Sequence, residues 1–324
     1  MNALQKIGTF GAAVAVCFAA AYGVGTAVSP INADPEPAAH QEGHPTEATG
    51  NTQDAATDTT PGGLQISQDG YTLDLATRQV AAGDPTELRL TIRDANGRPV
   101  TDFAREHEKE LHLIVASRDL TTFRHLHPVR AADGTWSTPA TLPEPGGYRV
   151  FADFRPAAEE EGLTLGADLA VSGAYEPAAL PPAGATATVD GYEVKLTGTL
   201  AAGAQSELTF TVTRDGEPVT DLEPYLGAYG HLVALRSGDL AYLHVHPHDE
   251  ASGDALSGSP DVTFTAAAPS TGDYRLFLDF KAEGKVHTAA FTVSAGEGPA
   301  GEPSGDTGNT GDTGNTGEEA PHGH

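Results

Sequence analysis

Two parts of this chain carry the same sequence pattern, and this duplication constrains the fold more than any other feature. The stretch HLIVASRDLTTFRHLHP at 112–128 aligns without a gap with HLVALRSGDLAYLHVHP at 231–247. The other matched pairs are DGYTLDL (69–75) with DGYEVKL (190–196), ELRLTIRDANGRPVTD (87–102) with ELTFTVTRDGEPVTD (207–221), and GGYRVFADF (146–154) with GDYRLFLDF (272–280). Such self-similarity predicts two copies of one domain.

We call the two copies repeat 1 and repeat 2. We expect them to span 62–173 and 184–295, with a Pro- and Ala-rich linker at 174–183 between them. A chain of 324 residues is long enough for two domains of ordinary size.

Both repeats have the pattern of β-strands. In repeat 1, Leu88, Leu90 and Ile92 alternate with polar residues and lead to the turn signal Asn96-Gly97. Repeat 2 has the same alternation, followed by an Asp-Gly pair. Short strands recur at intervals of about 8 to 12 residues, which is typical of β-sandwiches. The sequence therefore predicts an all-β fold with two tandem immunoglobulin-like β-sandwich domains.

The first 28 residues contain an uncharged apolar stretch from Ile7 to Val28, long enough to cross a membrane as a helix. Lys6 precedes this stretch, and the next Lys or Arg is Arg78, with several acidic residues between them. We therefore expect the bulk of the chain to be extracytoplasmic. Segment 1–28 is interpreted as a signal anchor and single-pass transmembrane helix. A cleaved signal peptide, which would release the protein, and a lipidated Cys17 are the alternatives.

The segments that flank the repeats have compositions typical of disorder. Residues 29–61 are rich in Pro, Thr, Asp and Glu, and residues 296–324 contain the low-complexity run DTGNTGDTGNTG. Neither segment has enough apolar residues to bury a core, so we expect a disordered linker and a disordered tail.

Charge and sulfur content exclude several classes of partner and site. The net charge of −27 repels phosphate backbones, so no nucleic acid partner is expected, while cations are compatible with it. Cys17 and Met1 are the single cysteine and the single methionine. An intrachain disulfide and a sulfur-rich metal site are therefore excluded.

The matched histidines are the strongest candidates for a functional site. Both repeats carry the spacing H-x12-H-x-H-P. In a strand, residues i and i+2 face the same side, roughly 6.6 Å apart, so two such imidazoles can converge on one ion. A hairpin between the strands would bring the first histidine to this pair. The six matched residues are His112, His125 and His127 in repeat 1, and His231, His244 and His246 in repeat 2.

Further residues extend the candidate metal sites. Asp153 and Asp279 occupy matching positions, and each is a candidate ligand, a partner that fixes a histidine tautomer, or a surface acid. Repeat 2 adds His248 and His287 as candidate ligands. The competing interpretation is structural, because duplicated domains also keep residues for packing. His107 is assigned to this structural interpretation.

Imidazole with optional carboxylate ligands suits Cu(II), Zn(II) or Ni(II), and in an exported protein we expect Cu(II) or Zn(II). The HLIV…HLHP…GYRVFADF pattern resembles that of a group of bacterial exported, membrane-anchored proteins with two repeats. It is also similar in general character to YtkA-like and CopC-like β-sandwich domains, and this resemblance implies a link to copper handling. It covers both repeats and their six matched histidines. CopC-like patterns start from an N-terminal histidine and often include methionines, and this chain departs from both features.

Two functions follow from these features. The leading hypothesis is a membrane-tethered extracytoplasmic protein that sequesters or delivers copper or zinc, with a metal-transport or other envelope protein as partner. The alternative is a non-enzymatic structural or interaction module of the cell envelope that binds no metal. The sequence contains no nucleophile motif, phosphate loop or arranged general base, so we do not expect an enzyme.

Overall fold

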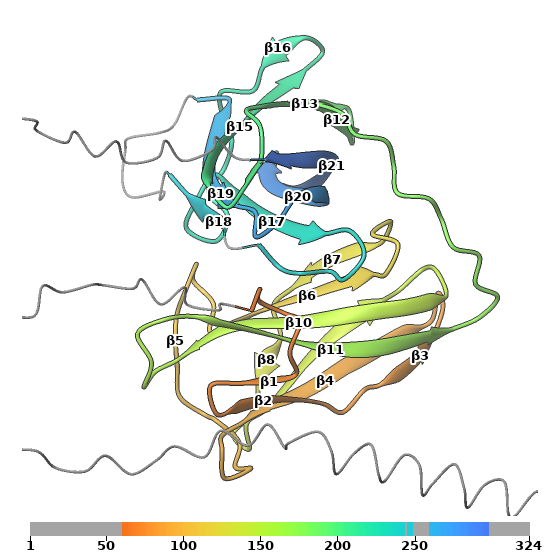
Figure 1. Cartoon of the computed structure of the whole chain (residues 1–324), viewed down its shortest axis with the longest axis vertical. Helices are drawn as coiled ribbons and strands as arrows, with labels where there is room; N and C mark the ends of the chain where they lie inside the picture. The colour runs from red at the N-terminus through yellow and green to blue at the C-terminus, as the bar shows by residue number, and fades with distance from the viewer. Residues whose placement is uncertain (1–59, 244, 249–258, 298–324) are drawn as a thin grey trace, which may run out of the picture. The chain divides into compact units, whose positions relative to one another are not determined.

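The computed structural model describes residues 60–243, 245–248 and 259–297 (Figure 1). The predicted membrane segment 1–28, almost all of the linker 29–61 and residues 298–324 of the tail lie outside the described residues. All regular secondary structure in the described ranges is β-strand, which confirms the all-β prediction. In the same ranges, no helix has the length and apolarity needed to span a membrane. All of the described residues belong to one compact unit, Asp58–His324.

Repeat 1 is a sandwich of two sheets (Figure 1). The first sheet has the strand order β1-β2-β4-β9-β8, and the second has β3-β11-β10-β6-β7, with β5 paired to β10. The strands are β1 (Ser67–Gln68), β2 (Tyr71–Leu75), β3 (Gln79–Ala81), β4 (Pro85–Arg93), β5 (Phe103–Ala104), β6 (Leu111–Ser117), β7 (Phe123–Leu126), β8 (Val129–Arg130), β9 (Thr135–Thr141), β10 (Gly146–Pro156) and β11 (Leu163–Ser172).

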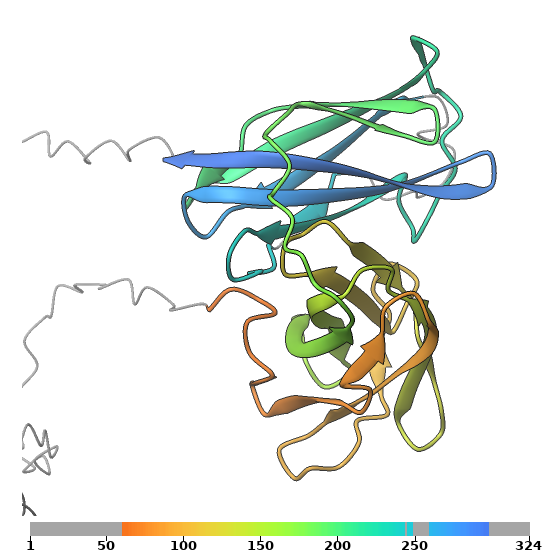
Figure 2. The ribbon, with the colours of Figure 1, turned by 90° about the vertical axis from the view of Figure 1, so that its right-hand side faces the viewer.

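Repeat 2 is a second sandwich, whose strands are also seen in the turned view of Figure 2. One sheet has the order β12-β13-β15-β19-β18, with β16 paired to β15, and the other has β14-β21-β20-β17. The strands are β12 (Thr186–Val189), β13 (Tyr192–Thr197), β14 (Ala201–Ala202), β15 (Gln205–Arg214), β16 (Glu217–Pro218), β17 (Gly230–Arg236), β18 (Val245–Pro247), β19 (Asp261–Ala267), β20 (Gly272–Ala282) and β21 (Lys285–Glu297).

The predicted alternation of side chains builds a core between the two sheets of each repeat. Leu88, Leu90 and Ile92 on β4 are at most 1% exposed and pack in the core of repeat 1 with Trp136. The core of repeat 2 is formed in the same way around Phe210 on β15. Because β-strand side chains point alternately to the two faces, every second residue of these strands is removed from water.

A tyrosine at the start of the same strand in each repeat marks a sandwich corner. The Tyr148 hydroxyl donates a hydrogen bond of 2.8 Å to the carbonyl of Glu144. The matching Tyr274 hydroxyl donates one of 2.8 Å to the carbonyl of Ser270. A tyrosine that bonds back to the backbone a few residues upstream is typical of immunoglobulin-like sandwiches. The two domains are thus tandem copies of one β-sandwich design.

A third apolar cluster joins the two repeats, and no sequence pattern predicts it separately from the two cores. The rings of Phe123 and Phe277 stack with centroids 4.1 Å apart and an angle of 8° between their planes. Strand β6 is buried along its whole length, because its alternate residues face its own core and this third cluster. The cluster consists of Ile114, Ala116, Leu120, Phe123 and Phe151 of repeat 1 with Val233, Leu235, Leu240 and Phe277 of repeat 2.

The stacked pair predicts energetic coupling between the repeats. Phe123→Ala and Phe277→Ala should each lower the free energy of unfolding by roughly 3 to 5 kcal/mol, the usual range for a buried phenylalanine. In the double variant the losses should fall short of additivity by about 0.5 to 1.5 kcal/mol, the value of an aromatic pair. Denaturant unfolding followed by circular dichroism measures both. Phe123→Ala combined with Phe210→Ala is the control and should be additive. Additive losses for Phe123 and Phe277 would contradict the contact.

Candidate metal site

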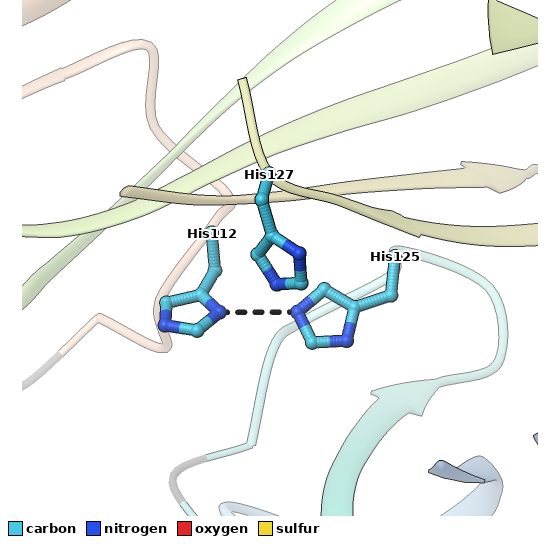
Figure 3. Close-up of side chains that lie close together, drawn as sticks. All are labelled: His112, His125 and His127. Atoms are coloured by element: carbon cyan, nitrogen blue, oxygen red, sulfur yellow. Dashed lines mark hydrogen bonds between the residues drawn. The ribbon is translucent and has the colours of Figure 1, made fainter. Parts of the chain in front are cut away.

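The β6–β7 hairpin gathers three histidines of repeat 1. The strands pair antiparallel, with Ile114 opposite His125, as the sequence predicts for this hairpin. His112 Nδ1 and His125 Nε2 lie 3.1 Å apart, and His127 follows directly after the end of β7. One ring nitrogen from each histidine lies within 4.8 Å of the others, and the three side chains point toward one another (Figure 3). We call His112, His125 and His127 the histidine triad.

Oxygen acceptors hold the outer nitrogens of two triad rings. His112 Nε2 lies 3.0 Å from the carbonyl oxygen of Glu106. His125 Nδ1 lies 2.8 Å from Oδ2 of Asp279. A carbonyl oxygen only accepts hydrogen bonds, so Nε2 of His112 carries its proton. When Asp279 is ionised it also only accepts, and Nδ1 of His125 then carries the proton of that ring. In neutral rings, the inner nitrogens of His112 and His125 are then both unprotonated.

With Asp279 ionised and both rings neutral, the inner nitrogens face each other with two lone pairs at 3.1 Å. Two acceptors at this separation repel each other unless a cation lies between them, and that cation is either a proton or a metal ion. An oxygen acceptor on the outer nitrogen is also the usual arrangement around a metal-bound histidine.

Asp279 acts on the triad from repeat 2. Its carboxylate and the His125 side chain are 4% and 3% exposed, so this pair is buried. The Oδ1 atom of Asp279 accepts a 2.5 Å hydrogen bond from Thr288 Oγ1. Of the three roles considered for this residue, the geometry matches the partner that fixes a histidine tautomer.

Asp153 occupies the matching place in repeat 1. It pairs across the sheet with His112 and accepts a 2.8 Å hydrogen bond from Thr164 Oγ1. Asp279 pairs in the same way with His231. Each repeat thus has a rung that consists of a histidine, an aspartate and a threonine.

The first histidine of repeat 2 lies against the triad of repeat 1. The His231 ring stacks on His112 with centroids 5.3 Å apart and an angle of 14°, and its centroid lies 4.7 Å from that of His125. Its Nδ1 atom is buried and has no hydrogen-bond partner among the described residues, as is also true of Nε2 of His127.

The sequence analysis assigned His231 to a separate site in repeat 2, whereas the structure places its ring beside His112 and His125 of repeat 1. The chain that follows β17 is also placed differently. Strand β18, which contains His246, pairs with β19 in the opposite sheet and not with β17. The side chain of His246 and the whole of His244 lie outside the described residues.

Two other candidates of repeat 2 are not brought to the triad. His287 Nδ1 bonds to Asp190 Oδ2 at 2.8 Å, and its ring packs against Phe280 inside repeat 2. His248 is exposed, and its Nε2 lies 2.5 Å from Thr265 Oγ1. The structure thus brings neither residue to the triad of repeat 1. Their predicted role in a site of repeat 2 with His244 and His246 stays a prediction, because those two side chains lie outside the described residues.

His107, which the sequence analysis set aside, lies beside the cluster. Its ring centroid is 5.3 Å from that of His231 and 6.1 Å from that of His112. It sits in a tight turn with φ of 48°, closed by backbone hydrogen bonds of 2.9 and 3.0 Å between Glu106 and Lys109. The spacing between His107 and His112 does not match the two-residue period of a strand, so strand periodicity could not place His107 at the site. Only recognition of the tight turn could have done so.

Burial favours the neutral form of His112, His127 and His231 by lowering the pKa of each. Desolvation first, and the neighbouring His125 second, lower the pKa of His112 to about 4. The same causes lower the pKa of His127 to about 3, and burial lowers that of His231 well below its ordinary value. Near neutral pH these rings thus present lone pairs, which are the form that binds metal. A cavity of about 460 Å³ borders the cluster and is lined by His107, His112 and His231, among others.

The fold and this site define a class of protein: tandem β-sandwiches with a buried histidine cluster where the repeats meet. The chain belongs to the family described as a domain of unknown function (DUF8832), which matches residues 66–171 and 187–297. The two matched segments correspond to the two tandem domains. A search of the curated proteins finds no match.

Solved structures with similar chains include bacterial surface proteins. FdeC, an Escherichia coli adhesin, is 18% identical, with 70% of this chain and 65% of that chain covered and a TM-score of 0.23. The Yersinia pseudotuberculosis adhesin InvE is 15% identical, with 71% and 60% covered and a TM-score of 0.24. An alpha-2-macroglobulin of Salmonella is 14% identical, with 72% and 15% covered and a TM-score of 0.25. This chain spans less than two thirds of each of these structures.

The lowered pKa values predict a stability that depends on pH in the metal-free protein. Because the pKa of His112 falls from 6.5 to about 4 on folding, the unfolded chain binds more protons between these values. Its contribution, on the order of 3 kcal/mol, is complete above pH 6.5 and is lost as the pH falls toward 4.

Urea unfolding in the presence of a chelator, repeated between pH 7.5 and about 4.5, measures this slope. His112→Gln should flatten the slope relative to the wild type. His248→Gln, at an exposed position, should leave it unchanged. An equal slope in the wild type and in His112→Gln would show that the folded protein does not depress the pKa of His112.

Proposed function

We propose that the chain binds Cu(II) or Zn(II) at the histidine triad. The observation that carries the proposal is the pair of opposed ring nitrogens of His112 and His125 at 3.1 Å, both of which are free to bind an ion when Asp279 is ionised and the rings are neutral. Two nitrogens bound to one ion are about 3.3 Å apart in a tetrahedral site and about 2.9 Å apart as neighbours in a square-planar site. The separation falls between these two values, so it fits either metal. The resemblance to YtkA-like and CopC-like domains favours copper.

Binding fits the site better than catalysis. A catalytic metal centre needs an open coordination position and a base that can take a proton from bound water. The carboxylate that contacts the triad, Asp279, has one oxygen bonded to His125 and the other to Thr288. It is thus committed to holding a ligand in place. We therefore propose sequestration or delivery of the metal, and no enzymatic role.

The cellular setting is part of the same proposal. The segment 1–28 would tether the protein to the cell membrane, or direct its secretion if cleaved, with both repeats outside the cytoplasm. A disordered linker at 29–61, as the composition predicts, would let the repeats reach a metal-transport or other envelope protein.

An interaction module without metal is the second candidate, and the apolar cluster between the repeats favours it. Phe123 and Phe277 hold the repeats together without any ion. In this case a proton would separate the lone pairs of His112 and His125, and Asp279 would pair with an imidazolium ring. The two candidates therefore differ in the cation that lies between the same two nitrogens.

Calorimetric titration of the full-length chain with Zn(II), and electron paramagnetic resonance with Cu(II), should detect one bound ion per chain. His125→Ala removes a triad nitrogen and should lower the affinity at least about 100-fold, since even partners one step from the metal contribute 10- to 100-fold. His248→Ala is the matched control and should bind as the wild type does. Equal affinity in the wild type and His125→Ala would rule out the triad.

A second test asks whether Asp279 supports metal binding or only packing. Asp279→Asn keeps the shape of the side chain but weakens the hydrogen bond that fixes the His125 tautomer, so affinity should fall about 10- to 100-fold. Asp190→Asn changes an equivalent bond, to His287 at 2.8 Å, and should leave metal affinity unchanged. Equal metal affinity in the two variants would contradict the role given to Asp279.

A further inference from the structure

We infer that His231 supplies a fourth metal ligand, so that one ion is shared by the two repeats and its binding strengthens their docking. The inference rests on the proposed function and deepens it. It differs from the expectation drawn from the sequence, in which each repeat holds its own ion.

The contacts of His231 carry the first step. Its ring lies flat against His112 at 5.3 Å and 4.7 Å from the ring of His125, so it touches two members of the triad. The Nδ1 atom is buried without a hydrogen-bond partner in the described part of the chain. A buried polar nitrogen without a partner is costly, and a bound cation would remove this cost. The ligand atoms of the triad lie within 4.8 Å of one another, and His231 lies beside this group. A turn of the His231 ring toward the triad would supply a fourth nitrogen, the number that a tetrahedral ion takes.

The relation between the repeats explains why this histidine is there. His112 and His231 are equivalent positions, and each pairs across its sheet with the equivalent aspartate, Asp153 or Asp279. When the same surface of two copies forms the contact, equivalent residues near the two-fold axis lie against each other.

The aromatic contacts follow the same rule. Phe123 stacks on Phe277 at 4.1 Å, and the equivalent residues Tyr242 and Phe151 lie 5.7 Å apart. The two repeats therefore associate through the same surface on each, in the manner of a symmetric dimer within one chain. In such an arrangement, a site at the stacked pair draws ligands from both halves.

A shared ion links metal binding to docking. Any opening that separates β17 (Gly230–Arg236) from the triad breaks one metal bond, so bound metal makes this opening rarer. The population of open forms that have released the ion falls by a factor of about 100 when the free metal concentration is 100 times the dissociation constant. Bound metal should therefore slow hydrogen exchange of the backbone amides of β17 as well as those of the β6–β7 hairpin.

Hydrogen exchange of the full-length chain with and without Zn(II) tests this coupling. In the wild type, zinc should slow exchange of the β6–β7 hairpin and of β17, by up to about 100-fold. His231→Phe keeps a flat ring against His112 but removes both nitrogens, and His231→Ala serves as a second variant in case the larger ring disturbs packing. In both variants zinc affinity should fall at least about 10-fold. At saturating zinc, the variants should still protect the hairpin but no longer protect β17.

The outcomes separate the two proposals. Zinc binding in the wild type, with equal affinity and equal protection of β17 in the His231 variants, would overturn the shared site and leave the triad as the proposed function. Absence of zinc binding in the wild type would overturn both.

Discussion

The buried hydrogen bond between His125 and Asp279 connects the features on which the site depends. It joins a strand of one repeat to a strand of the other at 2.8 Å, away from water. It also decides which nitrogen of His125 carries the proton. Glu106 does the same for His112, so two lone pairs face each other when Asp279 is ionised and both rings are neutral. In that state hydrogen-bond chemistry alone favours a cation between the two nitrogens, independently of any likeness to known metal sites.

Duplication and divergence explain the arrangement around this bond. The two repeats share a sandwich, a tyrosine corner and a rung of histidine, aspartate and threonine. They differ after the first histidine. In repeat 1, β7 pairs with β6, whereas in repeat 2, β18 pairs with β19 in the sheet that does not contain β17. The triad therefore comes from repeat 1 alone. Repeat 2 contributes Asp279 and His231 from the strands that meet it.

Much of the fold and part of the site could be predicted from the sequence. The alternation of Leu88, Leu90 and Ile92 indicated the strands, and the spacing of the histidines in 112–127 indicated a hairpin that brings them together. These signals are local, since they depend on strand period and turn length. The same reasoning gave three possible roles for Asp279 but could not choose among them.

The remaining features depend on contacts between distant parts of the chain. The run HLIVAS is as apolar as a core strand should be, and nothing in it distinguishes the face that packs on the other repeat. Motifs as similar as FRHLHP and YLHVHP gave no sign that their strands would pair with different sheets. His107 lies beside the cluster because of a turn with positive φ, which strand periodicity does not describe.

X-ray absorption at the zinc edge, on the full-length chain after removal of weakly held metal, tests the central claim most directly. Direct binding at the cluster predicts retained zinc, with imidazole nitrogens at about 2.0 to 2.1 Å and the scattering pattern of several histidine rings. Loss of the metal during this treatment, or a shell made of oxygen atoms alone, would contradict a metal centre at the histidine triad.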